Sequence, residues 1–257
     1  MVARAGIGLS VFAGLACAIS TGAQEAYEGG KGLLTLEGPS GMFLNPTSAT
    51  MPKGYGTLQY CILFAENRTD GVWNGFMGSY GLTDQLEIGA SGFQLDKPGE
   101  DPMGAGPFVR VRLRKDEPGG LPQVGAGVYS RISDDVFPDR GGDKVTAFAA
   151  AYKRLPRAEQ GFVKAVGLHA GVRHSWLDSR AEDSLLAGYG GLEVQLPLRC
   201  YVVGEVTTKD EDFNRHTPYA AGLQWRAAGV AMSFGAIQHG GLDEASFFYG
   251  IGYGCKL

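Results

Sequence analysis

Tyr249-Gly-Ile251-Gly-Tyr253-Gly-Cys255-Lys-Leu257 has an apolar side chain at every second position. In an extended strand, successive side chains point to opposite faces, so this stretch has one apolar face and one face of Gly and Lys. The same alternation, with Arg, Glu or Gln on the second face, runs through Val109-Arg-Val-Arg-Leu113-Arg114 and Leu192-Glu-Val194-Gln-Leu196. The pattern predicts β-strands, since a helix would repeat its apolar residues every three or four positions.

Twelve segments of this kind follow one another from Tyr55 onward, and no amphipathic helix competes with them. We expect strands near 55–64, 73–80, 85–93, 106–114, 122–131, 144–153, 162–172, 187–196, 200–206, 218–226, 229–236 and 246–257. After the first strand, long connections alternate with short ones. Up-and-down barrels of the bacterial outer membrane have short periplasmic turns and longer outer loops, whereas a soluble sandwich has no reason to sort its loops in this way. The sequence therefore predicts an all-β fold, an up-and-down antiparallel transmembrane β-barrel of about 12 strands.

The composition excludes several other classes of protein. The chain has 257 residues, 44% of them hydrophobic and 19% charged, and its 41 glycines lack the three-residue period of collagen. The apolar content excludes a disordered chain, and the net charge of −4 leaves no basic surface for nucleic acid. Beyond the N-terminal region no uncharged run is long enough for a membrane helix. The cysteines of that part, Cys61, Cys200 and Cys255, are too scattered for a disulfide framework or a zinc site.

The N-terminal region has the pattern of a secretory signal peptide, with one basic residue, an apolar run and a small-residue end. We expect cleavage after Ala23 and export to the bacterial outer membrane, with a membrane-anchor helix as the alternative. The predicted organisation is a signal peptide at 1–23, an N-terminal periplasmic or plug segment at 24–54, and an outer-membrane β-barrel at 55–257.

Several stretches resemble bacterial outer-membrane barrel proteins. The sequence YGLTDQLEIG at 80–89 resembles a periplasmic turn of these barrels, and 217–225 resembles a late strand. The sequence GPSGMFLNPTSA at 38–49, followed by MPKG at 51–54, is similar to the start of YjbH-type barrels, which are associated with exopolysaccharide. The strand 249–257 resembles the terminal signal that the barrel-insertion machinery reads. The resemblance implies contact with outer-membrane lipid and lipopolysaccharide, and a role in polysaccharide export.

Strand parity predicts which polar side chains line the lumen. If Val109, Val111 and Leu113 face lipid, the arginines between them face inward. The expected pore-lining residues are Arg110, Arg112, Arg114, Glu87, Glu193, Glu205, His169, Gln224 and Arg226. Rings of basic residues select anions in a pore, whereas Arg–Glu pairs would fill a closed interior. Residues 24–53 could fold into the same space as a partial plug.

The six longer connections carry more acidic than basic residues. Their carboxylates could hold divalent cations that bridge to lipopolysaccharide, because hard cations prefer oxygen ligands. A solvated acidic rim is the alternative, and no loop has the spacing of an ordered metal site. We predict no metal and no cofactor. The main alternative to a pore is a closed barrel with a structural or adhesion role through these loops.

A lipid-modifying enzyme is a third possibility, for which His174-Ser175 and the nearby Asp178 are the candidate catalytic residues. Adjacent strand residues face opposite ways, so His174 cannot activate Ser175 in extended geometry. The chain has neither a Gly-x-Ser-x-Gly elbow nor His-Glu-x-x-His zinc spacing. We therefore predict no catalytic residues and no enzyme, but a small pore for polar or anionic solutes or a channel associated with polysaccharide export.

Aromatic residues near strand ends are expected to form girdles at the two membrane interfaces. These residues are Tyr60, Phe64, Tyr80, Tyr129, Tyr189, Trp225, Phe234 and Tyr253. A soluble β-sandwich or lipocalin-like barrel would instead direct its aromatic side chains inward. Period-two alternation alone does not distinguish the inner face from the outer one, so this alternative stays open.

Overall fold

The computed structural model of the chain describes residues 34–35, 39, 41–64, 71–96, 103–116, 120–133, 143–156, 161–177, 184–209, 216–227, 229–239 and 245–257. The predicted signal peptide at 1–23 lies outside these residues, as do most of the acidic residues of the predicted outer loops. Among the described residues there is no helix long and apolar enough to cross a membrane.

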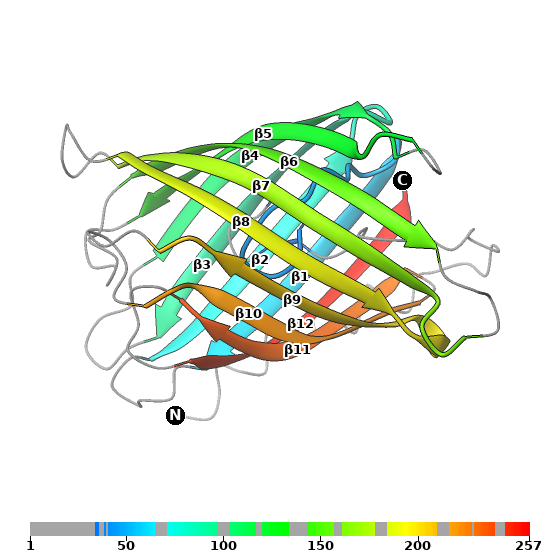
Figure 1. The fold of residues 1–257 in the computed structure, drawn as a ribbon. Helices are drawn as coiled ribbons and strands as arrows, with labels where there is room; N and C mark the ends of the chain where they lie inside the picture. Colours follow the sequence, from blue (N-terminus) through cyan, green and yellow to red (C-terminus); the bar gives the residue numbers. More distant parts are fainter. Residues whose placement is uncertain are drawn as a thin grey trace.

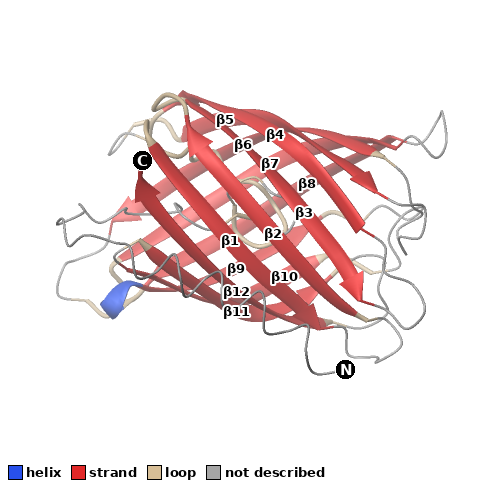
Figure 2. Ribbon diagram, turned by 180° about the vertical axis from the view of Figure 1, so that it is seen from behind, coloured by secondary structure: helices blue, strands red, loops and turns tan. Residues whose placement is uncertain are grey.

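Twelve strands form one closed antiparallel barrel, in which each strand pairs with its neighbours along the chain and the last strand closes on the first (Figures 1 and 2). This confirms the predicted all-β, up-and-down architecture and the predicted number of strands. The strands are β1 (Tyr55–Phe64), β2 (Val72–Gly81), β3 (Leu86–Asp96), β4 (Met103–Arg114), β5 (Gln123–Ser133), β6 (Lys144–Pro156), β7 (Ala165–Leu177), β8 (Ser184–Gln195), β9 (Cys200–Thr207), β10 (Tyr219–Ala227), β11 (Val230–Gln238) and β12 (Ser246–Lys256).

The two ends of the barrel differ in their connections. One end, which we call the short-turn end, has the connections 82–85, 115–122, 157–164, 196–199 and 228–229. The start of β1 at Tyr55 and the end of β12 at Lys256 lie at the same end. The turn from β2 to β3 is closed by Thr83, whose hydroxyl accepts the N–H groups of Gln85 and Leu86 at 3.1 and 2.9 Å. The turn from β10 to β11 uses Gly229 at φ 84°, a conformation that glycine adopts readily. The connections at the opposite end, which we call the long-loop end, are 65–71, 97–102, 134–143, 178–183, 208–218 and 239–245. They are longer on average, although 115–122 and 157–164 at the short-turn end are longer than 97–102 and 178–183.

The outer surface of the barrel is apolar. Large hydrophobic side chains on alternate strand positions are exposed, among them Leu58, Phe76, Leu113, Leu186 and Leu223. Soluble proteins rarely expose a continuous apolar surface, whereas a membrane barrel has an apolar band facing lipid and a polar interior. The faces of the strands are therefore those of a membrane barrel and not of a soluble lipocalin-like barrel.

Two details of the sequence-based interpretation are wrong. Tyr129 and Tyr189 do not belong to an interfacial girdle, because they share the parity of inward residues and are only 2% and 7% exposed. The strand expected at 162–172 is too short, because β7 continues to Leu177 and contains His174 and Ser175. The first error arises where small residues on both faces of a strand leave the alternation weak, as in Gly125-Ala-Gly-Val-Tyr129.

Candidate functional site

A segment of the chain that precedes β1 occupies the lumen. Figures 1 and 2 show it as a loop inside the barrel, and we call residues 41–53 the lumenal segment. It turns back on itself through a bridge between Gly41 and Pro46 and a hydrogen bond of 3.1 Å from Met42 N to Asn45 O. Phe43 is 4% exposed and Asn45 is fully buried. The interior of the barrel therefore contains a stretch of the chain that is not part of its wall.

Glu205 on β9 holds the tip of the lumenal segment. Its Oε1 accepts hydrogen bonds from the backbone N–H groups of Phe43 and Leu44 at 2.8 and 2.5 Å. Its Oε2 accepts from Asn45 twice, from the backbone N–H at 3.1 Å and from Nδ2 at 2.8 Å. A buried carboxylate is costly unless hydrogen bonds replace its hydration, and bonds to a charged acceptor are stronger than neutral ones. We call this contact the Glu205 clamp.

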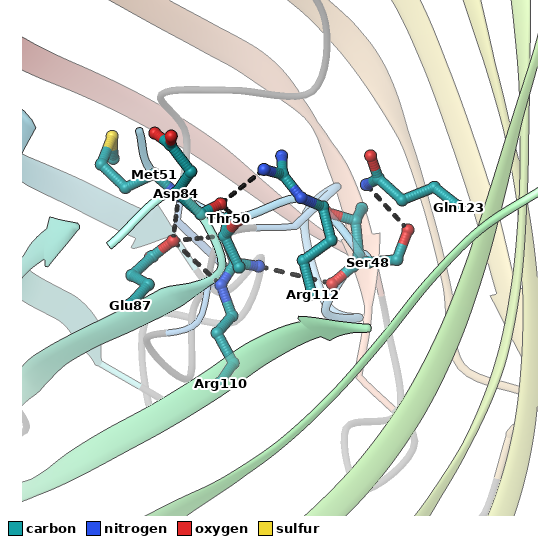
Figure 3. Close-up of polar contacts among 9 residues, drawn as sticks. Ser48, Thr50, Met51, Asp84, Glu87, Arg110, Arg112 and Gln123 are labelled. Carbon is teal, nitrogen blue, oxygen red and sulfur yellow. Dashed lines mark hydrogen bonds and ion pairs between the residues drawn. The ribbon is translucent and has the colours of Figure 1, made fainter. Parts of the chain in front are cut away.

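A buried ion pair holds the base of the segment (Figure 3). Glu87 on β3 and Arg110 on β4 are paired neighbours in the sheet, and Arg110 Nη2 lies 2.6 Å from Glu87 Oε2. The side chains of Arg110 and Glu87 are 2% and 0% exposed. The same Glu87 oxygen accepts the N–H of Met51 at 2.6 Å, and Arg110 Nη1 donates to Thr47 O at 3.3 Å. The ion pair therefore neutralises both buried charges and fixes the segment.

Other wall side chains bind the lumenal segment, two of them through its backbone carbonyls. Tyr189 donates its hydroxyl to Pro46 O at 2.9 Å, and Gln224 Nε2 donates to Met42 O at 3.2 Å. Gln123 Nε2 reaches the side chain of Ser48 at 3.1 Å (Figure 3). Because buried backbone groups must be hydrogen-bonded, these contacts replace the sheet or helix partners that the segment lacks.

The segment also completes an apolar core. Met42, Phe43 and Leu44 belong to one cluster of buried side chains that also contains residues of the wall. The ring of Phe43 meets that of Phe248 edge-on, with their centroids 4.5 Å apart. The other large wall residues of this cluster include Phe108, Tyr129, Phe148, Tyr189 and Val203. Burial of these apolar groups adds to the polar contacts that hold the segment.

The lumenal segment packs closely against Gly81 of β2, and a substitution at this position tests that contact. A Cβ at this position would overlap the carbonyl oxygen of Pro52 and lie 2.7 Å from Met51 O, and both are backbone atoms that cannot move alone. Gly81→Ala is expected to push the segment off Glu87 and to lower hydrogen-exchange protection at the Met51 amide on the order of tenfold, the value of one hydrogen bond to a charged acceptor. Gly204→Ala is the control, because a Cβ there meets nothing within 4 Å. Equal protection in the two variants would contradict this fit.

Basic residues predominate among the charged side chains of the described residues that lie on inward strand positions and are buried or half-buried. The basic ones are Arg110, Arg112, Arg131, Lys144, Arg154, Arg173 and Arg226. The acidic ones are Glu87, Glu193 and Glu205. Seven positive and three negative charges leave an excess of four positive charges on this part of the wall.

The residues expected to line a pore are placed as follows. Seven of them are buried inward side chains, namely Glu87, Arg110, His169, Glu193, Glu205, Gln224 and Arg226. Arg112 is half-buried and donates to Asp84 O at the turn (Figure 3). Arg114 follows a register shift in β4, is exposed, and donates to Pro122 O at 2.9 Å. Arg114 therefore lies at the rim, which corrects the expectation for this residue.

Three wall residues outside the expected pore-lining set also hold the chain that precedes β1. Gln59 binds Leu34 twice, accepting its N–H at 2.7 Å and donating to its carbonyl at 3.0 Å. Gln123 and Tyr189 contact the lumenal segment as described above. Their parity within the strands was the available signal, since all three share the face of other inward residues.

The pair considered for catalysis is divided between the two faces of the wall. His174 lies on the outer face against Trp176, with ring centroids 4.5 Å apart. Ser175 points inward, where its hydroxyl is hydrogen-bonded to that of Thr146 at 2.8 Å. The described residues contain no group of three or more His, Cys, Asp or Glu side chains able to hold a metal ion.

Comparison with known proteins identifies the fold. No family model matches the chain, and no curated protein matches it. Among solved structures, the KdgM porin in complex with disordered oligogalacturonate has a TM-score of 0.55 at 7% identity, over 77% of this chain and 98% of that one. The translocator domain of the autotransporter NalP from Neisseria meningitidis has a TM-score of 0.44 at 12% identity, over 79% of this chain and 87% of that one. The resemblance to YjbH-type barrels stays a prediction; the likeness to the KdgM porin shows that the chain has the fold of an outer-membrane β-barrel.

Proposed function

We propose that this chain is an outer-membrane channel for small polar or anionic solutes, closed by its own lumenal segment. The observation that carries the proposal is the Glu205 clamp, which holds a separate stretch of chain in the middle of the lumen by four hydrogen bonds. A barrel filled by its wall side chains alone has no room for such a segment. Displacement of the segment would therefore leave a passage at least as wide as a polypeptide chain.

The apolar outer surface supports a location in the bacterial outer membrane. Exposed side chains such as Phe76, Leu186 and Leu223 suit contact with lipid. The strand β12 presents Phe247, Tyr249 and Ile251 on this surface, and we propose that the barrel-insertion machinery recognises it through residues 249–257. Lipid and lipopolysaccharide are the remaining partners in this proposal, and it includes no catalytic activity.

The charge of the wall supports anionic solutes. Seven basic and three acidic inward side chains give a positive lumen, which lowers the electrostatic energy of an anion inside it. The KdgM porin, which shares the fold, is described in complex with oligogalacturonate, a polyanion. We extend that class of solute, carboxylated oligosaccharides, to this chain, in keeping with the predicted link to polysaccharide export.

A permanently closed barrel with a structural or adhesion role is the second candidate function. It is favoured by the apolar core that Met42, Phe43 and Leu44 form with the wall, since these contacts would be lost on opening. The two candidates differ in one observable, which is the passage of ions through the refolded barrel.

Ion selectivity in planar bilayers tests the channel. The test uses the Glu205→Ala barrel, which lacks the clamp, and the substitutions below are made in that background. In a potassium chloride gradient, its reversal potential is expected to show that chloride permeates more readily than potassium. The double variant Arg131→Gln/Lys144→Gln removes two inward charges and is expected to reduce this preference. Lys209→Gln, which removes a charge from an exposed position beyond β9, is expected to leave it unchanged. A preference for potassium would contradict the anionic passage, and no conductance in any variant would favour the closed barrel.

A further inference from the structure

A buried polar cluster lies on the wall made by β6 to β10, toward the short-turn end. It contains His169 of β7, Glu193 of β8 and Arg226 of β10, which are 6%, 4% and 7% exposed. Arg226 Nη2 lies 2.7 Å from Glu193 Oε2, and its guanidinium stands over the ring of Tyr201 at 4.2 Å. The imidazole of His169 stacks against Tyr152, with centroids 4.6 Å apart. These contacts fix the orientations of the basic groups.

Three nitrogen atoms of this cluster lack a hydrogen-bond partner within the described part of the chain. They are both ring nitrogens of His169 and Nη1 of Arg226. Buried polar atoms in folded proteins are nearly always hydrogen-bonded, and an unmade bond to a charged group is costly. Arg226 Nη1 is a donor, and a neutral imidazole has one donor nitrogen and one acceptor nitrogen. The described part of the chain therefore leaves room in this cluster for a further group that accepts hydrogen bonds.

The charge of the cluster determines which acceptor fits. Arg226 is balanced by Glu193, and the nearby Asp116, which accepts from the backbone N–H of Arg154, is balanced by Lys153 at 2.7 Å. The side chain of Arg154 on β6, which donates to Gln195 at 3.0 Å, therefore adds a positive charge in excess. His169 lies close enough to interact electrostatically with both Glu193 and Arg226. The net charge is therefore positive, and a carboxylate matches the planar donors of a guanidinium.

We propose that the lumen contains a binding site for the carboxylate of a small solute, formed by His169 and Arg226 and favoured by the charge of Arg154. This proposal rests on the proposed function, because it assigns the anionic solute a place on the wall. The carboxylate accepts from Arg226 Nη1 and from the donor nitrogen of His169, and Glu193 keeps the guanidinium in place.

The site is also connected with the lumenal segment. Gly191, the residue paired with His169 on β8, has no side chain, and the sulfur of Met42 occupies the space where a Cβ would stand. Gln224 donates to Met42 O and accepts from Arg226 Nε at 3.1 Å. A carboxylate bound to Arg226 would therefore be connected with Met42 through Gln224. Arg154 and Gln195, which lie toward the short-turn end, are half-buried, and this end is the side from which the proposal has a solute enter.

The site is tested by NMR of the full folded chain in detergent micelles with isotope-labelled histidine. The chain has four histidines, and His169→Asn identifies the signals of His169. Titration with sodium galacturonate is expected to shift the His169 signals saturably, whereas neutral galactose leaves them in place. The His174 signals, from the outer face of the same strand, are the internal control. Arg226→Lys keeps the charge beside Glu193 but removes Nη1, and it is expected to raise the apparent Kd by about tenfold or more.

Two results would overturn the site. One is the absence of a saturable shift of the His169 signals in both the wild type and Glu205→Ala. The titration would extend to about 100 mM galacturonate, far above the Kd of about 1 mM expected for a weak site. Glu205→Ala is included because access to the site in this variant does not depend on the clamp. The other is an equal response to galactose, which would mean that the carboxylate is not recognised. The NMR titration measures binding of galacturonate whether or not the barrel conducts ions. Failure of the channel proposal would appear as a lack of conductance, and failure of this site would appear as a lack of binding.

Discussion

Glu205→Ala is expected to free the lumenal segment from the wall. The substitution removes the acceptor of four hydrogen bonds to Phe43, Leu44 and Asn45 without leaving a charge behind. Because hydrogen bonds to a charged acceptor contribute about 1.5–3 kcal/mol each and do not add fully, we expect a loss on the order of 3 kcal/mol. The amides of Phe43, Leu44 and Asn45 should then lose about 100-fold in hydrogen-exchange protection.

The neighbouring residue of β9 provides the control for this prediction. Val206 lies on the outer face and is 50% exposed, so Val206→Ala should leave the protection of the segment unchanged. Heat-modifiable migration on a gel would show that both variants are folded. A folded Glu205→Ala variant with wild-type protection at 43–45 would contradict the clamp, since other contacts would then hold the segment.

Arg110→Ala is expected to destabilise the whole barrel. The substitution leaves the fully buried carboxylate of Glu87 without its ion-pair partner and removes the donor to Thr47 O. Removal of one member of a buried ion pair costs about 3–5 kcal/mol, because the remaining charge keeps its desolvation penalty. The free energy of unfolding in urea, measured on the refolded barrel in detergent, should fall by about this amount.

Two further variants separate charge burial from loss of the side chain. Arg112→Ala, two positions along the same strand, removes an exposed hydrogen bond to Asp84 O and should cost about 1 kcal/mol or less. The double variant Glu87→Gln/Arg110→Gln buries no charge and should be more stable than Arg110→Ala. If Arg110→Ala and Arg112→Ala lost equal stability, the buried pair would have no special role.

Much of the barrel could be predicted from period-two alternation. Strands such as 109–114 and 249–257 have charged or small residues on one face and apolar residues on the other, so their type and their faces follow directly. The same parity placed Glu87, Glu205 and Arg226 on the inner wall before any contact was known. Alternation is a local property of the sequence. It predicts which face of the wall a single side chain occupies.

Contacts between distant parts of the chain could not be predicted in this way. Glu205 and Asn45 are separated by 160 positions, and nothing in either local sequence indicates that they meet. Tyr129 was assigned to the wrong face because small residues around it on both faces weaken the pattern. Whether the interior is open, filled by ion pairs or filled by the segment at 41–53 depends on such contacts, and for this reason the sequence left these alternatives open.

Single-channel recording in planar bilayers tests the central claim most directly, which is that the lumenal segment closes an otherwise open passage. The wild-type chain without residues 1–23 and its Glu205→Ala variant would be compared, with Val206→Ala as the control. We predict that the wild type and the control are closed for most of the recording, and that Glu205→Ala is open for most of it, with stepwise conductance and a preference for anions. A folded Glu205→Ala barrel whose segment exchanges freely, but which conducts no more than the wild type, would contradict the claim.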